Sequence, residues 1–188
     1  MDEASLAAVT EAATADPGSC AVVLVEGMSD QAAVQTLAER SGRDLSAEGV
    51  FVVPMGGATN VGHFVDLFGP SGYGVRLAGL CDQREERDFR RGLDGVGPYF
   101  VCVADLEDEL IRALGTRRVE ELIEAEGEHG AFLTFTRQPA HRGEGRDQQL
   151  RRFMGTRSSR KVRYGHILAA ALDPARVPGP LAGLLAAM

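Results

Sequence analysis

Hydrophobic and polar positions divide the chain into short apolar runs and longer segments that have one apolar face. The apolar runs predict four β-strands, at residues 22–25, 51–55, 75–80 and 98–103. The segments between them predict helices at residues 30–40, 60–68 and 85–93. Strands that alternate with helices in this way predict an α/β fold with a parallel sheet of about four strands and right-handed crossovers.

The two ends of the chain are predicted to be helical. The alanine-rich residues 2–15 stop at Asp16-Pro17-Gly18, a helix-ending combination. Beyond Ile111 the pattern is helical to the end, with breaks near Gly115, Gly127, Gly143 and Gly155. We therefore expect an N-terminal helix at residues 1–19, an α/β core at 20–115 and a helical, Arg-rich extension at 116–188 packed on that core.

Length and composition narrow the class of protein. A chain of 188 residues with 44% hydrophobic residues suits a folded domain rather than a disordered segment. No apolar run approaches the ~18 residues of a membrane span, and the N-terminus lacks a signal-peptide pattern. The three cysteines have no paired metal-binding spacing, which favours reduced core thiols over zinc. We expect a cytoplasmic protein, and the oligomeric state stays open.

Charge is distributed unevenly along the chain. Up to Gly130 there are 24 acidic residues against 10 arginines, whereas the remainder has 3 acidic residues against 9 arginines and one lysine. Such asymmetry is typical of a nucleic-acid-binding surface, although a solvated helix face gives the same pattern. The candidates for contact with nucleic acid are Arg151, Arg152, Arg157, Arg160 and Arg163.

The first strand is the most informative stretch. Val22-Val23-Leu24-Val25 is followed at once by Glu26, a tight turn at Gly27, and Ser29 as a candidate helix cap. In an open parallel sheet, ligands bind beyond the carboxyl ends of the strands, where Glu26 should lie. Asp30 is either part of the same site or an acid that stabilises the start of the helix.

Three of the predicted strands end in acidic residues. These are Glu26 after the first, Asp82 after the third, and Asp105 and Glu107 after the fourth. If the strands are neighbours, the carboxylates meet at one edge and need a cation to limit their repulsion. Oxygen ligands without histidine or cysteine suit Mg²⁺ or Mn²⁺, which activate water and polarise phosphodiesters.

These residues resemble a known family. Val-Leu-Val-Glu-Gly-Met-Ser-Asp is similar to the glutamate motif of Toprim domains, and Pro54-Met55-Gly56-Gly57, Asp82 and the 105–110 segment resemble the Toprim domain of OLD (overcoming lysogenization defect) nucleases. The likeness covers roughly residues 22–172. It implies a Toprim-like sheet, cleavage of DNA and a set of metal ligands, here Glu26, Asp30, Asp82, Asp105, Glu107 and Glu109.

The resemblance also implies a catalytic lysine. Lys161, the only lysine in the chain, falls where the family has it, so Glu26, Asp82 and Lys161 are the expected catalytic residues. Its ammonium is a compact charge that would stabilise the transition state at a phosphate. This placement requires the helical extension to fold back over the carboxyl ends of the strands.

Two features depart from the family pattern. The usual Asp-x-Asp reads Asp82-Gln83-Arg84, where Glu85 is a candidate substitute but the arginine would repel a second metal ion. The phosphate-binding loop of an ATPase is missing, so any ATPase would be a partner on a separate chain.

The sequence as a whole favours a metal-dependent nuclease acting on DNA. Two alternatives stay open: an RNA-processing Toprim nuclease, and a catalytically weakened Toprim module that binds nucleic acid or a partner ATPase.

Overall fold

The computed structural model describes residues 3–188, with side chains described from Leu6 onward. Within this range the centre is a four-stranded sheet in the order β2-β1-β3-β4, with all pairs parallel. The strands are β1 (Ala21–Val25), β2 (Val50–Pro54), β3 (Arg76–Asp82) and β4 (Tyr99–Cys102). The α/β fold with a parallel sheet of about four strands is confirmed.

The register brings the carboxyl ends of the strands together at one edge. Val25 at the end of β1 lies opposite Pro54 of β2 on one side and Leu80 of β3 on the other. Asp82 lies opposite Cys102, the last residue of β4. Residues that follow β1 and β3 are therefore neighbours at this edge.

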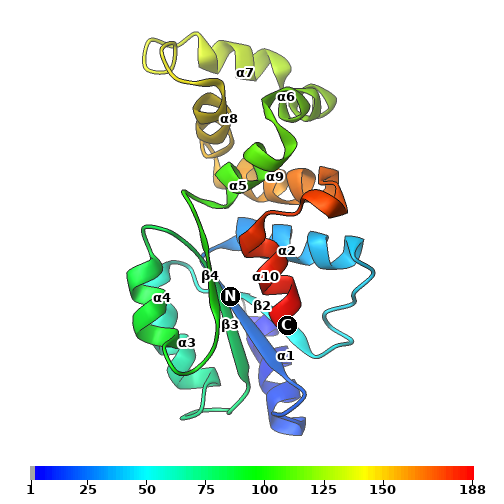
Figure 1. Cartoon of the computed structure of the whole chain (residues 1–188), viewed down its shortest axis with the longest axis vertical. Coiled ribbons are helices and arrows are strands. Elements are labelled where there is room, and N and C mark those ends of the chain that lie inside the picture. Colours follow the sequence, from blue (N-terminus) through cyan, green and yellow to red (C-terminus); the bar gives the residue numbers. More distant parts are fainter. Residues whose placement is uncertain (1–2) are drawn as a thin grey trace.

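Helices cover both faces of the sheet (Figure 1). On one face, Val22 and Leu24 share a core with α1 (Glu3–Ala15), α3 (Val61–Phe68) and α4 (Glu86–Leu93), and the 3₁₀ turn η1 (Ala58–Asn60) precedes α3. On the other face, Val23 and Val25 belong to a core that includes α2 (Met28–Arg40), α9 (Ser158–Ala171) and α10 (Gly179–Ala187). The burial of β1 on both faces follows from its unbroken apolar sequence.

The remaining helices form a lobe beyond one end of the sheet. They are α5 (Leu106–Leu114), α6 (Thr116–Ala125), α7 (His129–Thr136) and α8 (Arg146–Met154). Figure 1 shows α6, α7 and α8 at the far end of the molecule from α1. Phe132 and Phe153 of this lobe and Tyr164 of α9 are fully buried in the same hydrophobic cluster as Val23 and Val25. The helical extension and the sheet thus share one continuous core.

Helices α2 and α9 pack unusually closely. A Cβ atom on Gly165 would lie 2.6 Å from the backbone oxygen of Ser29, so only glycine allows this approach. Further along the pair, Thr36 Oγ1 lies 2.7 Å from His166 Nδ1, and Arg40 donates to the backbone oxygen of Leu172. Helix α9 is therefore fixed over the start of α2, which is the end that faces the strand edge.

Two local predictions were wrong. Gly27, in extended conformation, is the N-cap of α2, and its N–H donates to the Asp30 carboxylate at 2.8 Å, whereas Ser29 lies inside the first turn. The helical extension also has a break that was not predicted, where Asp173 caps the 3₁₀ turn η2 (Pro174–Arg176) between α9 and α10. The prolines at 174 and 178 explain this break, since proline is accepted only at the start of a helix.

In the part of the chain that the structure describes, no helix has both the length and the apolar character needed to cross a membrane.

Candidate metal centre

Glu26 lies at the carboxyl edge of the sheet, directly after β1. Its backbone oxygen accepts hydrogen bonds from the N–H groups of Gly56 and Gly57, both at 3.1 Å. These glycines have φ angles of 73° and 127°, which other residues rarely adopt. The Pro54-Met55-Gly56-Gly57 segment therefore positions Glu26 from the neighbouring strand.

Asp82 and Glu85 complete a group of three carboxylates with Glu26. Asp82 ends β3, and a turn in which Glu85 N–H donates to the Asp82 backbone oxygen at 3.0 Å brings Glu85 back toward the edge. One ligand oxygen from each of the three residues lies within 4.8 Å of the others. Glu85 Oε2 is buried and has no hydrogen-bond partner among the described residues.

The ionisation of these acids reflects their crowding. Burial raises the pKa of Asp82 to about 8, and the nearby charges of Asp30, Asp105, Glu26 and Glu85 add to the shift. Burial also raises the pKa of Glu26, reinforced by Glu85 and Asp30. A bound cation would reverse these shifts, because it stabilises the charged carboxylates that burial and mutual repulsion disfavour.

Asp30 is buried beside this group but already has a structural partner. One of its oxygens accepts the hydrogen bond from Gly27 N–H that begins α2. Burial raises its pKa, which the Gly27 hydrogen bond and the charge of Lys161 oppose. The structure thus gives Asp30 the helix-stabilising role, and its predicted role as a metal ligand stays a prediction.

The other three predicted ligands lie at the start of α5 and are engaged by basic side chains. Asp105 is the N-cap of α5, accepts from the Asp108 N–H at 2.9 Å and pairs with Arg151. Glu109 accepts from the Val103 N–H at 2.9 Å and pairs with Arg112 at 2.8 Å. None of these acids belongs to the group formed by Glu26, Asp82 and Glu85 among the described residues.

Glu107 and Lys161 form the contact between α5 and α9 at the site. Lys161 Nζ lies 3.4 Å from Glu107 Oε2. Glu107 is only 2% exposed, and its Oε1 has no hydrogen-bond partner in the described part of the chain. Burial raises the Glu107 pKa to about 7, against the opposing effect of Lys161. Although burial disfavours the Lys161 ammonium, Glu107, Asp30 and Asp82 raise its pKa, so Lys161 carries its charge at the edge of the site.

The five arginines predicted to contact nucleic acid fall into two separate groups. Arg151 and Arg152 border a pocket of about 430 Å³ together with Lys161 and Arg84. Arg157, Arg160 and Arg163 line a different, smaller pocket with Glu128. The five arginines therefore lie on two surfaces rather than one.

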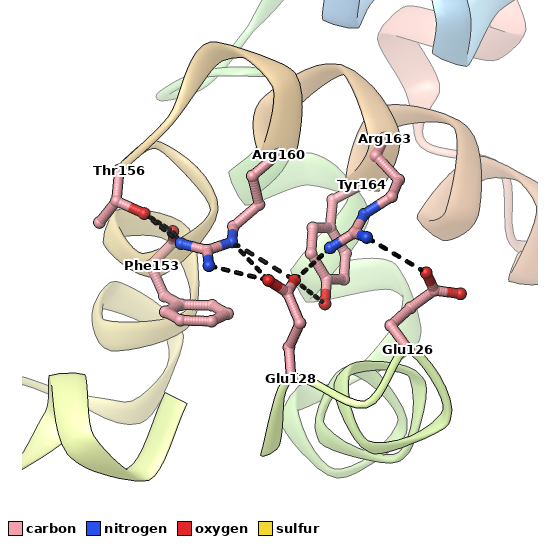
Figure 2. Close-up of polar contacts among 7 residues, drawn as sticks. All are labelled: Glu126, Glu128, Phe153, Thr156, Arg160, Arg163 and Tyr164. Atoms are coloured by element: carbon pink, nitrogen blue, oxygen red, sulfur yellow. Dashed lines mark hydrogen bonds and ion pairs between the residues drawn. The ribbon is translucent and has the colours of Figure 1, made fainter. Parts of the chain in front are cut away.

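Glu128 binds two arginines of the second group, Arg160 and Arg163, within the protein (Figure 2). Its carboxylate accepts hydrogen bonds from Arg160, Arg163 and the hydroxyl of Tyr164. The guanidinium of Arg160 also stacks 4.1 Å above the ring of Phe153. Arg160 and Arg163 thus stabilise the joint between the α6–α7 turn and α9, and their predicted contact with nucleic acid stays a prediction.

Arg84 was not among the predicted site residues, and Glu85 was predicted only as a candidate substitute for the missing second acid. Both follow Asp82 in the turn before α4, and Arg84 lines the same pocket as Lys161. The sequence signal that could have identified both residues is their position directly after an acid that ends a strand, where the usual Asp-x-Asp motif stands.

The residues present fit a hard divalent cation. The three carboxylates supply only oxygen ligands, which suit Mg²⁺ or Mn²⁺. The unpartnered buried oxygen of Glu85 shows that the group is incomplete without a donor or a cation.

Comparisons with known proteins agree with this fold. Residues 19–83 match the model of the family described as overcoming lysogenization defect protein-like, TOPRIM domain. No curated protein matches the sequence. The fold matches the C-terminal region of the Burkholderia pseudomallei OLD protein with a TM-score of 0.63 and 20% identity, over 89% of this chain and 96% of that one.

A second solved structure gives a similar result. The C-terminal region of the Xanthomonas campestris pv. campestris OLD protein matches with a TM-score of 0.66 and 23% identity, over 88% of this chain and 92% of that one. Residues 19–83 are therefore similar to the OLD-like Toprim domain family, and the chain has the fold of the C-terminal region of OLD proteins.

Proposed function

We propose that this protein is a Mg²⁺- or Mn²⁺-dependent nuclease that hydrolyses or nicks the phosphodiester backbone of DNA. The observation that supports the proposal is the group formed by Glu26, Asp82 and Glu85, three carboxylates within 4.8 Å at the carboxyl edge of a parallel sheet. Anionic groups this close are destabilising without a cation, and this edge is where open α/β sheets bind ligands. The preference for DNA over RNA follows from the likeness to OLD nucleases.

In this proposal Glu26, Asp82 and Glu85 hold the ion. A bound Mg²⁺ or Mn²⁺ polarises a phosphoryl oxygen and lowers the pKa of water. The chain's own contribution is to fix the carboxylates: the Gly56 and Gly57 N–H groups hold the backbone of Glu26, and the turn after β3 orients Glu85.

Lys161 has the second role. Its ammonium is kept charged by Glu107, Asp30 and Asp82, and α9 holds it in place through the close contact with α2. A fixed positive charge beside the reacting phosphate stabilises negative charge as it develops, without the cost of reorganising water.

A plasmid-nicking assay tests the proposal. Supercoiled DNA is incubated with pure protein in Mg²⁺, Mn²⁺ or EDTA, alongside structured RNA to test the RNA-processing alternative. We expect nicking with either ion and none in EDTA. Glu26→Gln should lower the rate at least ~100-fold, equivalent to about 2.7 kcal/mol.

Glu11→Gln provides the matched control, because Glu11 is an exposed acid on α1. A wild type that cleaves neither nucleic acid with either ion, or a Glu26→Gln variant as active as the wild type, contradicts the proposal.

A second candidate is a catalytically weakened module that binds nucleic acid or a partner ATPase. Arg84 favours it, because an arginine stands where the usual motif has its second acid. This candidate predicts salt-dependent binding of DNA, with a slope of about −0.9 in log affinity against log salt for each phosphate contact. It also predicts no cleavage in either ion, with or without an added ATPase.

A further inference from the structure

We propose that the site binds one divalent ion and that the adjoining pocket holds a substrate phosphate, with Arg84 and Lys161 in place of a second ion. This phosphate pocket has a volume of about 430 Å³ and is bordered by Arg84, Arg151, Arg152 and Lys161. This inference rests on the proposed nuclease function and specifies how the site would hold its substrate.

The phosphate pocket is assembled from segments far apart in the sequence. Arg84 comes from the turn after β3, Arg151 and Arg152 from α8, and Lys161 from the first turn of α9. Four cationic groups thus meet beside the three carboxylates. Arg151 pairs with Asp105, Arg152 with Glu144 and Lys161 with Glu107. The positive charge of Arg84, which is unpaired among the described residues, favours an anion here and opposes a second cation.

The acids on this side are not available to a metal ion. Asp105 pairs with Arg151 and caps α5, Glu107 lies against Lys161, and Glu109 pairs with Arg112. To coordinate an ion, each would have to give up a charge-assisted contact in a partly buried setting. In the group around Glu26 no such cation is paired with the three carboxylates among the described side chains, so one ion fits there.

Arg84 has the features of a phosphate ligand. Its side chain is exposed to the pocket, and no hydrogen bond or ion pair engages it among the described residues. A guanidinium presents donors in a planar fork that matches two phosphate oxygens, and the Lys161 ammonium adds a compact charge.

Glu107 gives an independent sign that the pocket binds a polar ligand. Glu107 lines the pocket, and its buried Oε1 lacks a donor from the described chain. A water or hydroxyl group that accompanies the phosphate would satisfy it.

The first test counts the ions. Mn²⁺ is titrated into the full chain without nucleic acid, by calorimetry and by the paramagnetic resonance signal of free Mn²⁺. We expect one ion in the wild type and none in Glu26→Gln. Arg84→Asp restores the Asp-x-Asp pattern and should admit a second ion. Arg87→Asp is the matched control with the same charge change, because Arg87 is exposed and lies outside the pocket, so it should still bind one ion.

The second test uses inorganic phosphate as the probe, in Mg²⁺ and followed by backbone amide resonances. Arg84→Ala and Lys161→Gln should each weaken phosphate binding about 10-fold, which corresponds to about 1.4 kcal/mol, whereas Arg87→Ala should leave it unchanged. The amide spectra also report whether each variant is folded.

The outcomes separate this inference from the proposed function. Two ions bound by the wild type, or unchanged phosphate affinity in Arg84→Ala, would overturn the inference and leave a metal-dependent nuclease standing. A wild type that nicks no DNA and binds no Mn²⁺ would overturn the proposed function.

Discussion

At the scale of single residues, Lys161 shows how a charge is placed and kept. The ammonium touches Glu107 at 3.4 Å and is raised in pKa by three acids, yet its side chain is still 41% exposed. It is therefore held from one side by the protein and open to a substrate on the other.

Lys161→Arg should lower turnover at least ~10-fold, or about 1.4 kcal/mol, with little change in DNA affinity. The positive charge is kept, but a planar fork cannot occupy the position of a compact ammonium beside Glu107. Single-turnover nicking and DNA binding measured on the same samples separate the two effects.

Arg117→Lys is the control for this swap. Arg117 is exposed on α6 and lies outside the phosphate pocket, so the reverse substitution should leave turnover unchanged. Full activity in Lys161→Arg would show that Lys161 is an ordinary surface residue with no role in catalysis.

At the scale of the elements, two contacts decide where the helical lobe sits. Glu128 joins the α6–α7 turn to α9 through Arg160, Arg163 and Tyr164 (Figure 2). Gly165 lets α9 approach α2. Together they hold α9, and with it Lys161, over the strand edge.

Glu128→Gln should destabilise the fold by about 1–3 kcal/mol, because it removes the charge from a partly buried set of charge-assisted hydrogen bonds. Although burial opposes the shift, the hydrogen bonds from Arg160 and Tyr164 lower the pKa of Glu128 below its usual 4.5. The lowered pKa means that this stabilisation is present above about pH 4.5 and is lost as the pH falls further. The stability difference between wild type and variant, measured by urea unfolding, should shrink accordingly below pH 4.5.

Glu126→Gln is the comparison for this variant, since Glu126 contacts only the edge of the same group, 3.8 Å from Arg163. It should cost less than about 0.5 kcal/mol, as a surface ion pair does. Equal losses in the two variants would show that Glu128 has no special place in the joint.

Gly165→Ala should destabilise the protein by about 1–3 kcal/mol through overpacking, since the added Cβ would lie 2.6 Å from a backbone oxygen that cannot move aside. It should also lower nicking activity, because α9 carries Lys161. Thermal unfolding and the plasmid assay measure the two effects.

Gly130→Ala makes the same change in α7 where nothing lies within 4 Å of the new Cβ. There the higher helix propensity of alanine should stabilise the protein by up to about 1 kcal/mol. A Gly165→Ala variant as stable as Gly130→Ala would contradict the close contact between α2 and α9.

At the scale of the whole molecule, the acidic edge links stability to pH and to metal. The pKa of Asp82 is raised from 3.8 to about 8, and that of Glu107 from 4.5 to about 7. Between about pH 4 and about pH 8, the folded protein binds more protons at these two carboxyl groups than the unfolded chain does. Their contribution to stability therefore falls as the pH rises from about 4 to about 8.

In EDTA, the melting temperature should fall as the pH is raised across this interval, and a fixed concentration of Mn²⁺ should raise it more at pH 8 than at pH 6. Ion binding at about 100 times the Kd stabilises by about 2.7 kcal/mol, or roughly 5–10 °C for a domain of this size. Differential scanning calorimetry measures the effect.

Asp82→Asn is the matching variant. The amide carries no charge to bury, so the melting temperature in EDTA at pH 8 should rise and the gain from Mn²⁺ should be lost. A gain from Mn²⁺ that is equal at both pH values and persists in Asp82→Asn would separate metal binding from this group of acids.

Much of the fold could be predicted from the sequence because the signals are local. The apolar run at 22–25, the glycines after 54 and the acids after two strands each lie within a few residues, so strand ends at one edge place Glu26 and Asp82 together. Local spacing did not predict the N-cap of α2, because Ser29 and Gly27 both fit the sequence pattern of an N-cap residue. The hydrogen bond from the Gly27 N–H to the Asp30 carboxylate makes Gly27 the N-cap.

The sequence by itself determined the parallel sheet, the alternation of strands and helices along the chain, and the two acids at the sheet edge, since hydrophobic periodicity and strand ends are properties of neighbouring residues. Only the tertiary structure decided which acids are free for a metal ion. The contacts of Asp105 with Arg151, Glu107 with Lys161 and Glu128 with Arg160 join residues 32 to 54 positions apart. Such ion pairs depend on how helices pack against one another. The charge pattern along the chain does not show which distant residues come into contact.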